Sequence, residues 1–123
     1  MAGRILIVEN DESIRTLFAE ALRSESIELD ELADAGPAID AIRSGRYDVV
    51  VLDLRLPKKD SFEILRAIRD DAERPVILAF SASTEDVRSV AGDRSVMMCI
   101  NKAFALHNPE PVIAAIAAVT QVR

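Results

Sequence analysis

Short apolar runs alternate with longer amphipathic stretches along the whole chain. Four of the runs are almost entirely apolar and occupy residues 5–8, 48–52, 76–80 and 96–100. Continuous apolar runs of this length are typical of strands that are covered on both faces of a sheet. Residues 27–29 alternate weakly between apolar and polar positions, which favours an edge strand. The pattern therefore predicts five strands.

The stretches between the runs carry apolar residues at helical spacing. In the first stretch, one helix face is predicted to be apolar at Ile14, Leu17, Phe18, Ala21 and Leu22. A second helix is expected to begin near Pro37, which suits a first helical turn, and to end at Gly45. A third helix is expected over residues 62–68, where apolar residues again recur every three positions.

Two further helices are expected towards the C-terminus. Ser83 is followed three residues later by Asp86, which resembles a capping box, and Gly92 would close the helix that Ser83 opens. Asn108 before Pro109 resembles an N-cap followed by proline in the first turn of the last helix. These signals complete a set of five predicted helices.

Strands that alternate with helices predict an α/β fold, with a five-stranded parallel sheet and helices on both faces. The length of 123 residues fits a single domain over residues 1–123, with no separate output domain. Half of the residues are hydrophobic but only 4% are aromatic, so aliphatic side chains must form most of the core.

The chain is acidic, with a formal net charge of −6 at pH 7. This charge predicts no direct binding to nucleic acid and no attachment to an anionic membrane. No apolar run approaches the roughly 20 residues of a membrane span, and no secretory signal precedes the first strand. Cys99 is the single cysteine, and no Cys/His set has the spacing of metal ligands. These features predict a cytoplasmic protein.

Polar residues follow four of the predicted strands. Glu9 and Asn10 come directly after the first strand, and Asp53 comes directly after the third. Ser81 follows the fourth strand, and Lys102 lies just beyond the fifth. In α/β proteins, ligands bind at the sheet edge where the carboxyl ends of parallel strands meet. With the strand order 2-1-3-4-5, this edge would gather carboxylates, a hydroxyl and an ammonium group.

Such a set of side chains suits phosphoryl chemistry. Carboxylates that lie a few ångström apart repel each other, and Mg²⁺, which favours one or two carboxylates and waters, relieves the repulsion. Lys102 can pair with a phosphoryl oxygen, and Ser81 supplies a further donor. An ionised Asp53 is then placed to attack phosphorus. Taken singly, each residue is as easily a turn, cap or surface residue, so the prediction depends on the whole set.

The chain resembles the receiver domain of bacterial two-component systems over nearly its whole length. The resemblance is carried by residues 4–15, by residues 47–57 with Asp53-x-x-Leu56-Pro57 followed by Asp60, by Ser81-Ala82 and by Lys102-Ala103-Phe104. It implies a flavodoxin-like fold with the strand order 2-1-3-4-5.

The resemblance also implies that Asp53 is the phosphoacceptor of a regulator that is not an enzyme beyond its own phosphorylation and dephosphorylation. Glu9 and Asn10 match the acidic pair that holds Mg²⁺ in this family. Asp53 and the backbone carbonyl of Arg55 would complete the metal ligands.

Lys102 and Ser81 match the residues that approach the phosphoryl group in this family. The implied partners are a sensor histidine kinase or a phosphotransfer protein, which would supply the phosphoryl group, and a downstream protein target. Phosphorylation would shift a balance between two conformers. A homodimer through the fourth helix, the fifth strand and the fifth helix is also expected.

Four residues depart from the usual pattern of the family. Asn10 replaces the second acid, which removes one formal charge and predicts weaker Mg²⁺ binding. Ala103 follows Lys102 in place of proline, so a trans peptide bond and a differently shaped loop are expected. Cys99 stands where a switch aromatic is usual, and Ser61 replaces a glycine that would shape the turn into the third helix.

Arg55 lies two residues beyond Asp53, where its side chain could cover the site and slow hydrolysis; a solvated arginine is an equal alternative. An aspartyl-phosphate hydrolase would need a carboxylate at that position, and an FMN-binding flavodoxin would need more aromatic residues. Two functions remain: a phosphoacceptor switch, or a degenerate receiver that binds proteins independently of phosphorylation. Asn10, Cys99 and Ala103 favour the second of these.

Overall fold

The computed structural model describes residues 3–23, 27–56 and 61–122, which form a single parallel sheet with helices on both faces. The strand order is β2-β1-β3-β4-β5, as the family resemblance implied. Within these ranges the strands are β1 (Arg4–Val8), β2 (Glu28–Leu32), β3 (Val49–Asp53), β4 (Val76–Ser81) and β5 (Val96–Asn101). The predicted fold class is confirmed.

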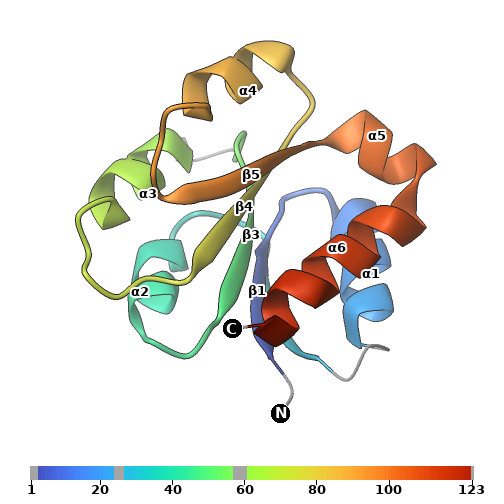
Figure 1. Ribbon diagram of the computed structural model, residues 1–123, viewed down its shortest axis with the longest axis horizontal. Helices are drawn as coiled ribbons and strands as arrows, with labels where there is room; N and C mark the ends of the chain where they lie inside the picture. The colour runs from blue at the N-terminus through green and yellow to red at the C-terminus, as the bar shows by residue number, and fades with distance from the viewer. Residues whose placement is uncertain (1–2, 24–26, 57–60, 123) are drawn as a thin grey trace.

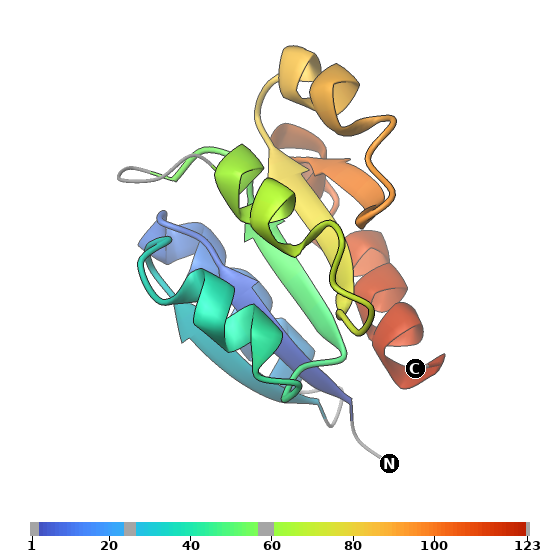
Figure 2. The same cartoon turned by 90° about the vertical axis from the view of Figure 1, so that its left-hand side faces the viewer.

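The helices of the described ranges cover the sheet in two layers (Figures 1 and 2). They are α1 (Glu12–Arg23), α2 (Ala38–Arg43), α3 (Ser61–Ile68), α4 (Thr84–Val90), α5 (Lys102–His107) and α6 (Pro109–Val122). Helices α1 and α6 lie on one face, and α2 and α3 lie on the other. No helix in these ranges is long and apolar enough to cross a membrane.

Alternate residues of the central strands face the two layers. In β1, Ile5 and Ile7 pack with the α1 and α6 side, whereas Leu6 and Val8 pack with the α2 and α3 side. All four are at most 2% exposed, which explains why this strand is continuously apolar. Burial of each such side chain contributes about 1.5–3 kcal/mol to folding before entropy is counted.

The register of the strands sets which strand ends lie side by side. Val8 of β1 pairs with Leu52 of β3, so the residues that follow each of them, Glu9 and Asp53, are neighbours. Asp53 in turn pairs with Phe80 of β4. Backbone pairing alone therefore brings the ends of β1, β3 and β4 together at one edge of the sheet.

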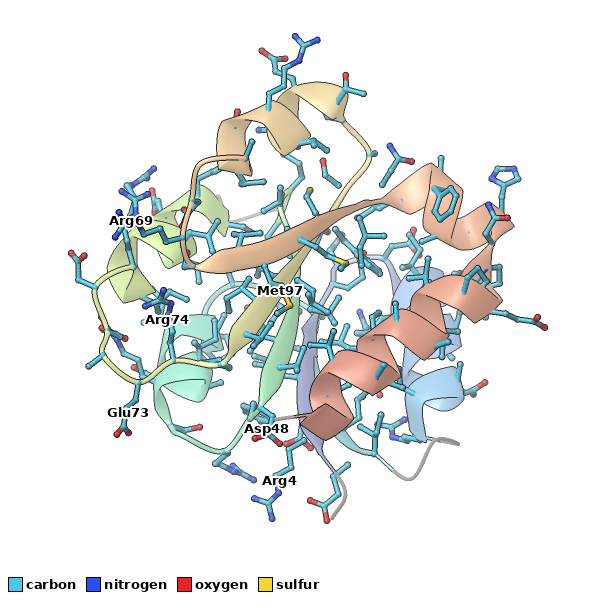
Figure 3. The ribbon with its side chains drawn as sticks, viewed as in Figure 1. Arg4, Asp48, Arg69, Glu73, Arg74 and Met97 are labelled. Atoms are coloured by element: carbon cyan, nitrogen blue, oxygen red, sulfur yellow. The ribbon has the colours of Figure 1, made fainter. Side chains whose placement is uncertain are left out.

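Different contacts form at the opposite end of the sheet, where the strands begin. Asp48 accepts a hydrogen bond through Oδ2 from the backbone N–H of Arg4 at 3.0 Å, where β1 and β3 begin. Figure 3 shows both side chains at this end of the molecule, far from the end where the strands stop. Asp48 is thus an acidic residue next to β3 that takes no part in the candidate site.

The segment after β5 differs from the sequence prediction, because α5 is an additional helix between β5 and the predicted last helix. Asn101 caps it by accepting a hydrogen bond through Oδ1 from the N–H of Phe104 at 3.0 Å. Ala103, a good helix former, allows the helix to begin directly at Lys102. The Lys102–Ala103 bond is trans, as expected, since none of the described residues has a cis peptide bond.

Asn108 stands directly before the last helix, as predicted, and it also ends the preceding helix. Its side-chain amide donates to the carbonyl of Phe104 at 3.1 Å, and its backbone N–H donates to the same oxygen at 2.8 Å. Asn108 therefore satisfies a free carbonyl at the end of α5, and α6 begins immediately afterwards at Pro109. The sequence pattern predicted this boundary, and the hydrogen bonds of Asn108 to α5 are an addition that it did not indicate.

Candidate functional site

Three charged side chains meet at the sheet edge where the strands end. Lys102 Nζ lies 3.0 Å from Glu9 Oε1 and 3.1 Å from Asp53 Oδ2. The side chains of Glu9 and Asp53 are only 2% and 3% exposed, and that of Lys102 is 16% exposed. The structure thus brings together three of the residues that the sequence singled out. They come from the residue after β1, the end of β3 and the start of α5.

The surroundings of Glu9 disfavour its charged form and shift its pKa. Burial and the neighbouring Asp53 carboxyl raise the pKa of Glu9 to about 7, although Lys102 acts in the opposite direction. Burial alone would lower the pKa of Lys102, but the hydrogen bond to Glu9 and the charges of both carboxylates outweigh it, so that pKa is raised. The ammonium group therefore stays charged, and one cation faces two acids.

Two cations would balance two carboxylates better than one, which makes this edge a candidate metal site. Glu9 Oε1 is buried and accepts no hydrogen bond among the described residues, although Lys102 Nζ is close. Its other oxygen accepts from the N–H of Asp11 at 3.1 Å and from Lys102 at 3.2 Å. A buried carboxylate oxygen without a hydrogen bond is an oxygen that a hard cation can use.

The ligand set that the sequence named fits Mg²⁺ by its chemistry. No group of three or more His, Cys, Asp or Glu side chains with metal-binding geometry occurs in the part of the chain that the structure describes. Mg²⁺ needs no such cage, because one or two carboxylates with waters suffice. Glu9 and Asp53 would supply the carboxylates. Asn10, which is exposed beside Glu9, and the carbonyl of Arg55 would supply further oxygens.

The backbone around Asp53 holds its carboxyl group in place. The N–H of Arg55 donates to Asp53 Oδ1 at 2.9 Å, and the Ser61 hydroxyl donates to the Asp53 carbonyl. Ser61 is fully buried at the start of α3. Its role in fixing the residue after β3 was not predicted; the turn that Ser61 was expected to reshape lies at residues 57–60, outside the described residues.

Ser81 and Arg55 meet at a residue that the sequence analysis treated only as part of a cap. Asp86 of α4 accepts from Arg55 Nε at 2.9 Å through Oδ2 and from Nη2 at 2.5 Å through Oδ1. The Ser81 hydroxyl donates to Asp86 Oδ2 at 2.9 Å. The Arg55 hydrogen bond lowers the pKa of Asp86, with Ser81 acting in the same direction against the effect of burial. Asp86 is thus held as a carboxylate.

The cap itself is formed as predicted, but without a complete capping box. Ser83 Oγ accepts from the N–H groups of Glu85 and Asp86 at 3.1 and 3.3 Å. The N–H of Ser83 donates to Ser81 Oγ at 3.0 Å, so the Asp86 carboxylate is not needed to bond it. An acid in the first turn of α4 and an arginine after β3 were visible in the sequence, but only the fold connects them.

The family model of the response regulator receiver domain matches residues 5–115. The chain belongs to this family. It is therefore a receiver domain of the response regulators of two-component signalling, whose receiver domains are regulatory phosphoacceptors. The resemblance seen in the sequence is confirmed.

Curated relatives of this receiver domain are longer proteins. The DNA-binding response regulator MtrA of Mycolicibacterium smegmatis is 34% identical over 92 residues, which are 75% of this chain and 40% of MtrA. The transcriptional regulatory protein TcrA of Mycobacterium tuberculosis is 36% identical over 89 residues, or 72% of this chain and 35% of TcrA. The chain thus spans less than half the length of these relatives.

Solved receiver structures share the fold. The phosphorylated cyanobacterial phytochrome response regulator RcpA superposes with a TM-score of 0.84 at 27% identity, over 98% of this chain and 95% of RcpA. The response regulator TrrA of Thermotoga maritima, in complex with Mg²⁺ and BeF, superposes with a TM-score of 0.75 at 27% identity, over 94% of this chain and 98% of TrrA.

The relatives correct the expectation that nucleic acid is not a partner. MtrA is named as a DNA-binding protein, so the family includes proteins that bind DNA. The expectation was wrong because the net charge of −6 describes only these 123 residues. They match 40% of MtrA, and the charge of a receiver says nothing about DNA binding by the remainder of such a protein. The expectation of a single domain stays a prediction.

Proposed function

We propose that this receiver domain accepts a phosphoryl group on Asp53 from the phosphohistidine of a histidine kinase, with Mg²⁺ as cofactor. The observation that carries the proposal is the contact of Lys102 Nζ with both Glu9 and Asp53 at the edge where the strands end. One ammonium and two carboxylates in a buried setting match what a transferred phosphoryl group and a divalent cation require.

The side chains have distinct tasks in the proposed reaction. A carboxylate oxygen of Asp53 attacks phosphorus, the phosphorus–nitrogen bond of the phosphohistidine breaks, and its electron pair stays on the imidazole nitrogen. The N–H of Arg55 orients the Asp53 carboxylate at 2.9 Å before the attack. Lys102 pairs with an oxygen of the arriving group, and this ammonium replaces solvent that the buried site excludes.

Mg²⁺, when bound, supplies positive charge beside the phosphoryl oxygens. Glu9, Asn10, Asp53 and the carbonyl of Arg55 are the oxygens that would hold the ion. The buried Glu9 Oε1 without a hydrogen bond supports this assignment, and so does the complex of the related TrrA with Mg²⁺ and BeF. Asn10 contributes a neutral oxygen, so the ion is held by one fewer formal charge than in receivers with two acids there.

A phosphorylation assay tests the proposal. The chain is incubated with acetyl phosphate and Mg²⁺, and the intact mass is measured for the wild type, Asp53→Asn and Asp48→Asn. Asp48 is the matched control, since it stands at the other end of β3 and bonds Arg4. We expect the added phosphoryl mass in the wild type and in Asp48→Asn but not in Asp53→Asn. Retention of the mass in Asp53→Asn contradicts the proposal.

A degenerate receiver that binds partners without phosphorylation is the second candidate. The hydrogen bond of the Ser81 hydroxyl to Asp86 favours it, because the hydroxyl is engaged away from the phosphoryl position. Asn10 and Cys99 point the same way, since the second acid and the usual aromatic are missing. A folded wild-type chain that gains no phosphoryl mass under the same conditions would select this candidate.

A further inference from the structure

We infer that Asp86 is a positioning residue that holds the side chains of Arg55 and Ser81 away from Asp53 and releases them when Asp53 carries a phosphoryl group. The inference rests on the proposed function and assigns a role to a residue of α4 that the phosphorylation chemistry itself does not use. Arg55, Ser81 and Asp86 together form the Asp86 cluster.

The acceptor of the Asp86 cluster is buried, whereas the side chain of Arg55 is 64% exposed. The guanidinium of Arg55 bonds both carboxylate oxygens of Asp86, at 2.9 and 2.5 Å. The Ser81 hydroxyl bonds Oδ2 at 2.9 Å. Asp86 is 1% exposed and Ser81 is fully buried. A two-point contact with a buried carboxylate fixes the direction of the arginine side chain.

The backbones of Arg55 and Ser81, the two donors of the Asp86 cluster, lie close to Asp53. Arg55 donates its own N–H to Asp53 Oδ1, so its backbone lies next to the Asp53 carboxyl group. Ser81 follows Phe80, which is the register partner of Asp53 in the neighbouring strand. In Figure 2, β4 runs upward towards α4, the helix that carries Asp86. The two side chains therefore leave the site region and turn towards α4.

The change in charge on phosphorylation explains why the side chains of Arg55 and Ser81 would move towards Asp53. A phosphoryl group brings a charge of about −1.5 to −2 and three acceptor oxygens, against the single charge of Asp86. The phosphoryl oxygens are therefore stronger acceptors for the Arg55 guanidinium and the Ser81 hydroxyl than the Asp86 carboxylate is. Once they leave, Asp86 is a buried carboxylate without partners, and the first turn of α4 has to move or admit water.

Local structure does not need the Asp86 carboxylate, which makes it available for this role. The helix cap is supplied by Ser83, and the N–H of Ser83 is satisfied by Ser81. The carboxylate therefore bonds side chains from two other parts of the chain instead of its own helix end. This coupling would link the phosphoryl site to α4 in a receiver that has Cys99 where a switch aromatic is usual.

Affinity for the phosphoryl analogue BeF₃⁻ tests the inference. BeF₃⁻ is titrated in the presence of Mg²⁺ into the wild type, Asp86→Asn and Asp93→Asn, and occupancy is followed by the backbone amide resonances. Asp93 is the matched control at the other end of α4: its side chain is 8% exposed, pairs with Arg69 and accepts from Ser95. Figure 3 shows Arg69 on the α3 side of the molecule.

We expect Asp86→Asn to lower the half-saturating BeF₃⁻ concentration by about tenfold, because a neutral amide oxygen holds Arg55 and Ser81 more weakly than the carboxylate does. Asp93→Asn should bind as the wild type does. Unchanged or weaker binding by Asp86→Asn, or an equal gain in Asp93→Asn, would overturn the inference. A purely structural role of Asp86 lowers thermal stability but gives no gain in affinity.

A second measurement needs no variant at all. In the wild type, the Arg55 Nε–H resonance should shift when BeF₃⁻ binds, since the guanidinium leaves Asp86 for the bound group. An unchanged resonance in the bound state would overturn the inference even if Asp86→Asn does not fold. Failure of the wild type to bind BeF₃⁻ is a separate result, which refutes the proposed function.

Discussion

The raised pKa of Glu9 predicts an unusual dependence of stability on pH. Glu9 has a pKa of about 7 in the folded chain, against an ordinary value of 4.5. Between these two pH values the folded state binds more protons than the unfolded state, so the free energy of unfolding falls as pH rises through that window. At about 1.4 kcal/mol per pKa unit, the loss amounts to about 3 kcal/mol.

The assay is urea unfolding at pH 5 and pH 8 in the presence of a chelator. We expect the wild type to lose about 3 kcal/mol between these two pH values and Glu9→Gln to lose far less. Glu20→Gln is the control, because Glu20 is an exposed glutamate on α1 and should leave the slope as in the wild type. A wild-type stability that is flat or rises over this range would refute the reasoning.

Added Mg²⁺ extends the same experiment. A cation that binds ionised Glu9 and Asp53 stabilises the folded state more at pH 8 than at pH 5, because the proton on Glu9 competes with it. We expect Mg²⁺ to flatten the pH slope of the wild type and to have little effect on Glu9→Gln. An equal effect of Mg²⁺ at both pH values would mean that Glu9 is not a ligand.

Three further changes have defined outcomes. Asn10→Asp restores a formal charge and should tighten Mg²⁺ binding several-fold in a titration; unchanged affinity would argue against Asn10 as a ligand. Arg55→Ala removes the side chain that the phosphoryl group is proposed to attract, so the aspartyl phosphate should decay several-fold faster, and an unchanged decay rate would count against this role. Lys102→Met leaves two buried carboxylates without their cation and should cost about 3 kcal/mol at pH 8, with a smaller loss at pH 5 by urea unfolding; an equal loss at both values would contradict the pairing.

Much of the fold follows from the sequence because strand burial leaves a direct pattern. Both faces of β1 are covered by helices, so the residues that point to either face are apolar. The same holds for β3 up to Asp53. Helical spacing then separates the strands, and the rule for parallel sheets places their carboxyl ends on one edge. This is why Glu9, Asp53 and Lys102 could be grouped before any contact was known.

Hydrogen-bond partners of side chains are harder to predict from sequence, because they depend on which donors the fold places next to each acceptor. Asp86 has the spacing of a capping box, yet Ser81 satisfies the N–H that Asp86 would have bonded. Asn108 has the pattern of an N-cap, yet it bonds the end of the preceding helix. In both cases a local pattern identifies a polar residue near a helix end, and tertiary contacts decide the partner.

The central claim is that Glu9, Asp53 and Lys102 together hold a transferred phosphoryl group, and a crystal structure grown with Mg²⁺ and BeF₃⁻ tests it most directly. The account predicts BeF₃⁻ bonded to a carboxylate oxygen of Asp53, with Lys102 Nζ within hydrogen-bond distance of a fluorine and the metal ion against Glu9 or Asn10. BeF₃⁻ on a different residue, or Lys102 still paired only with Glu9 and turned from the bound group, would contradict it.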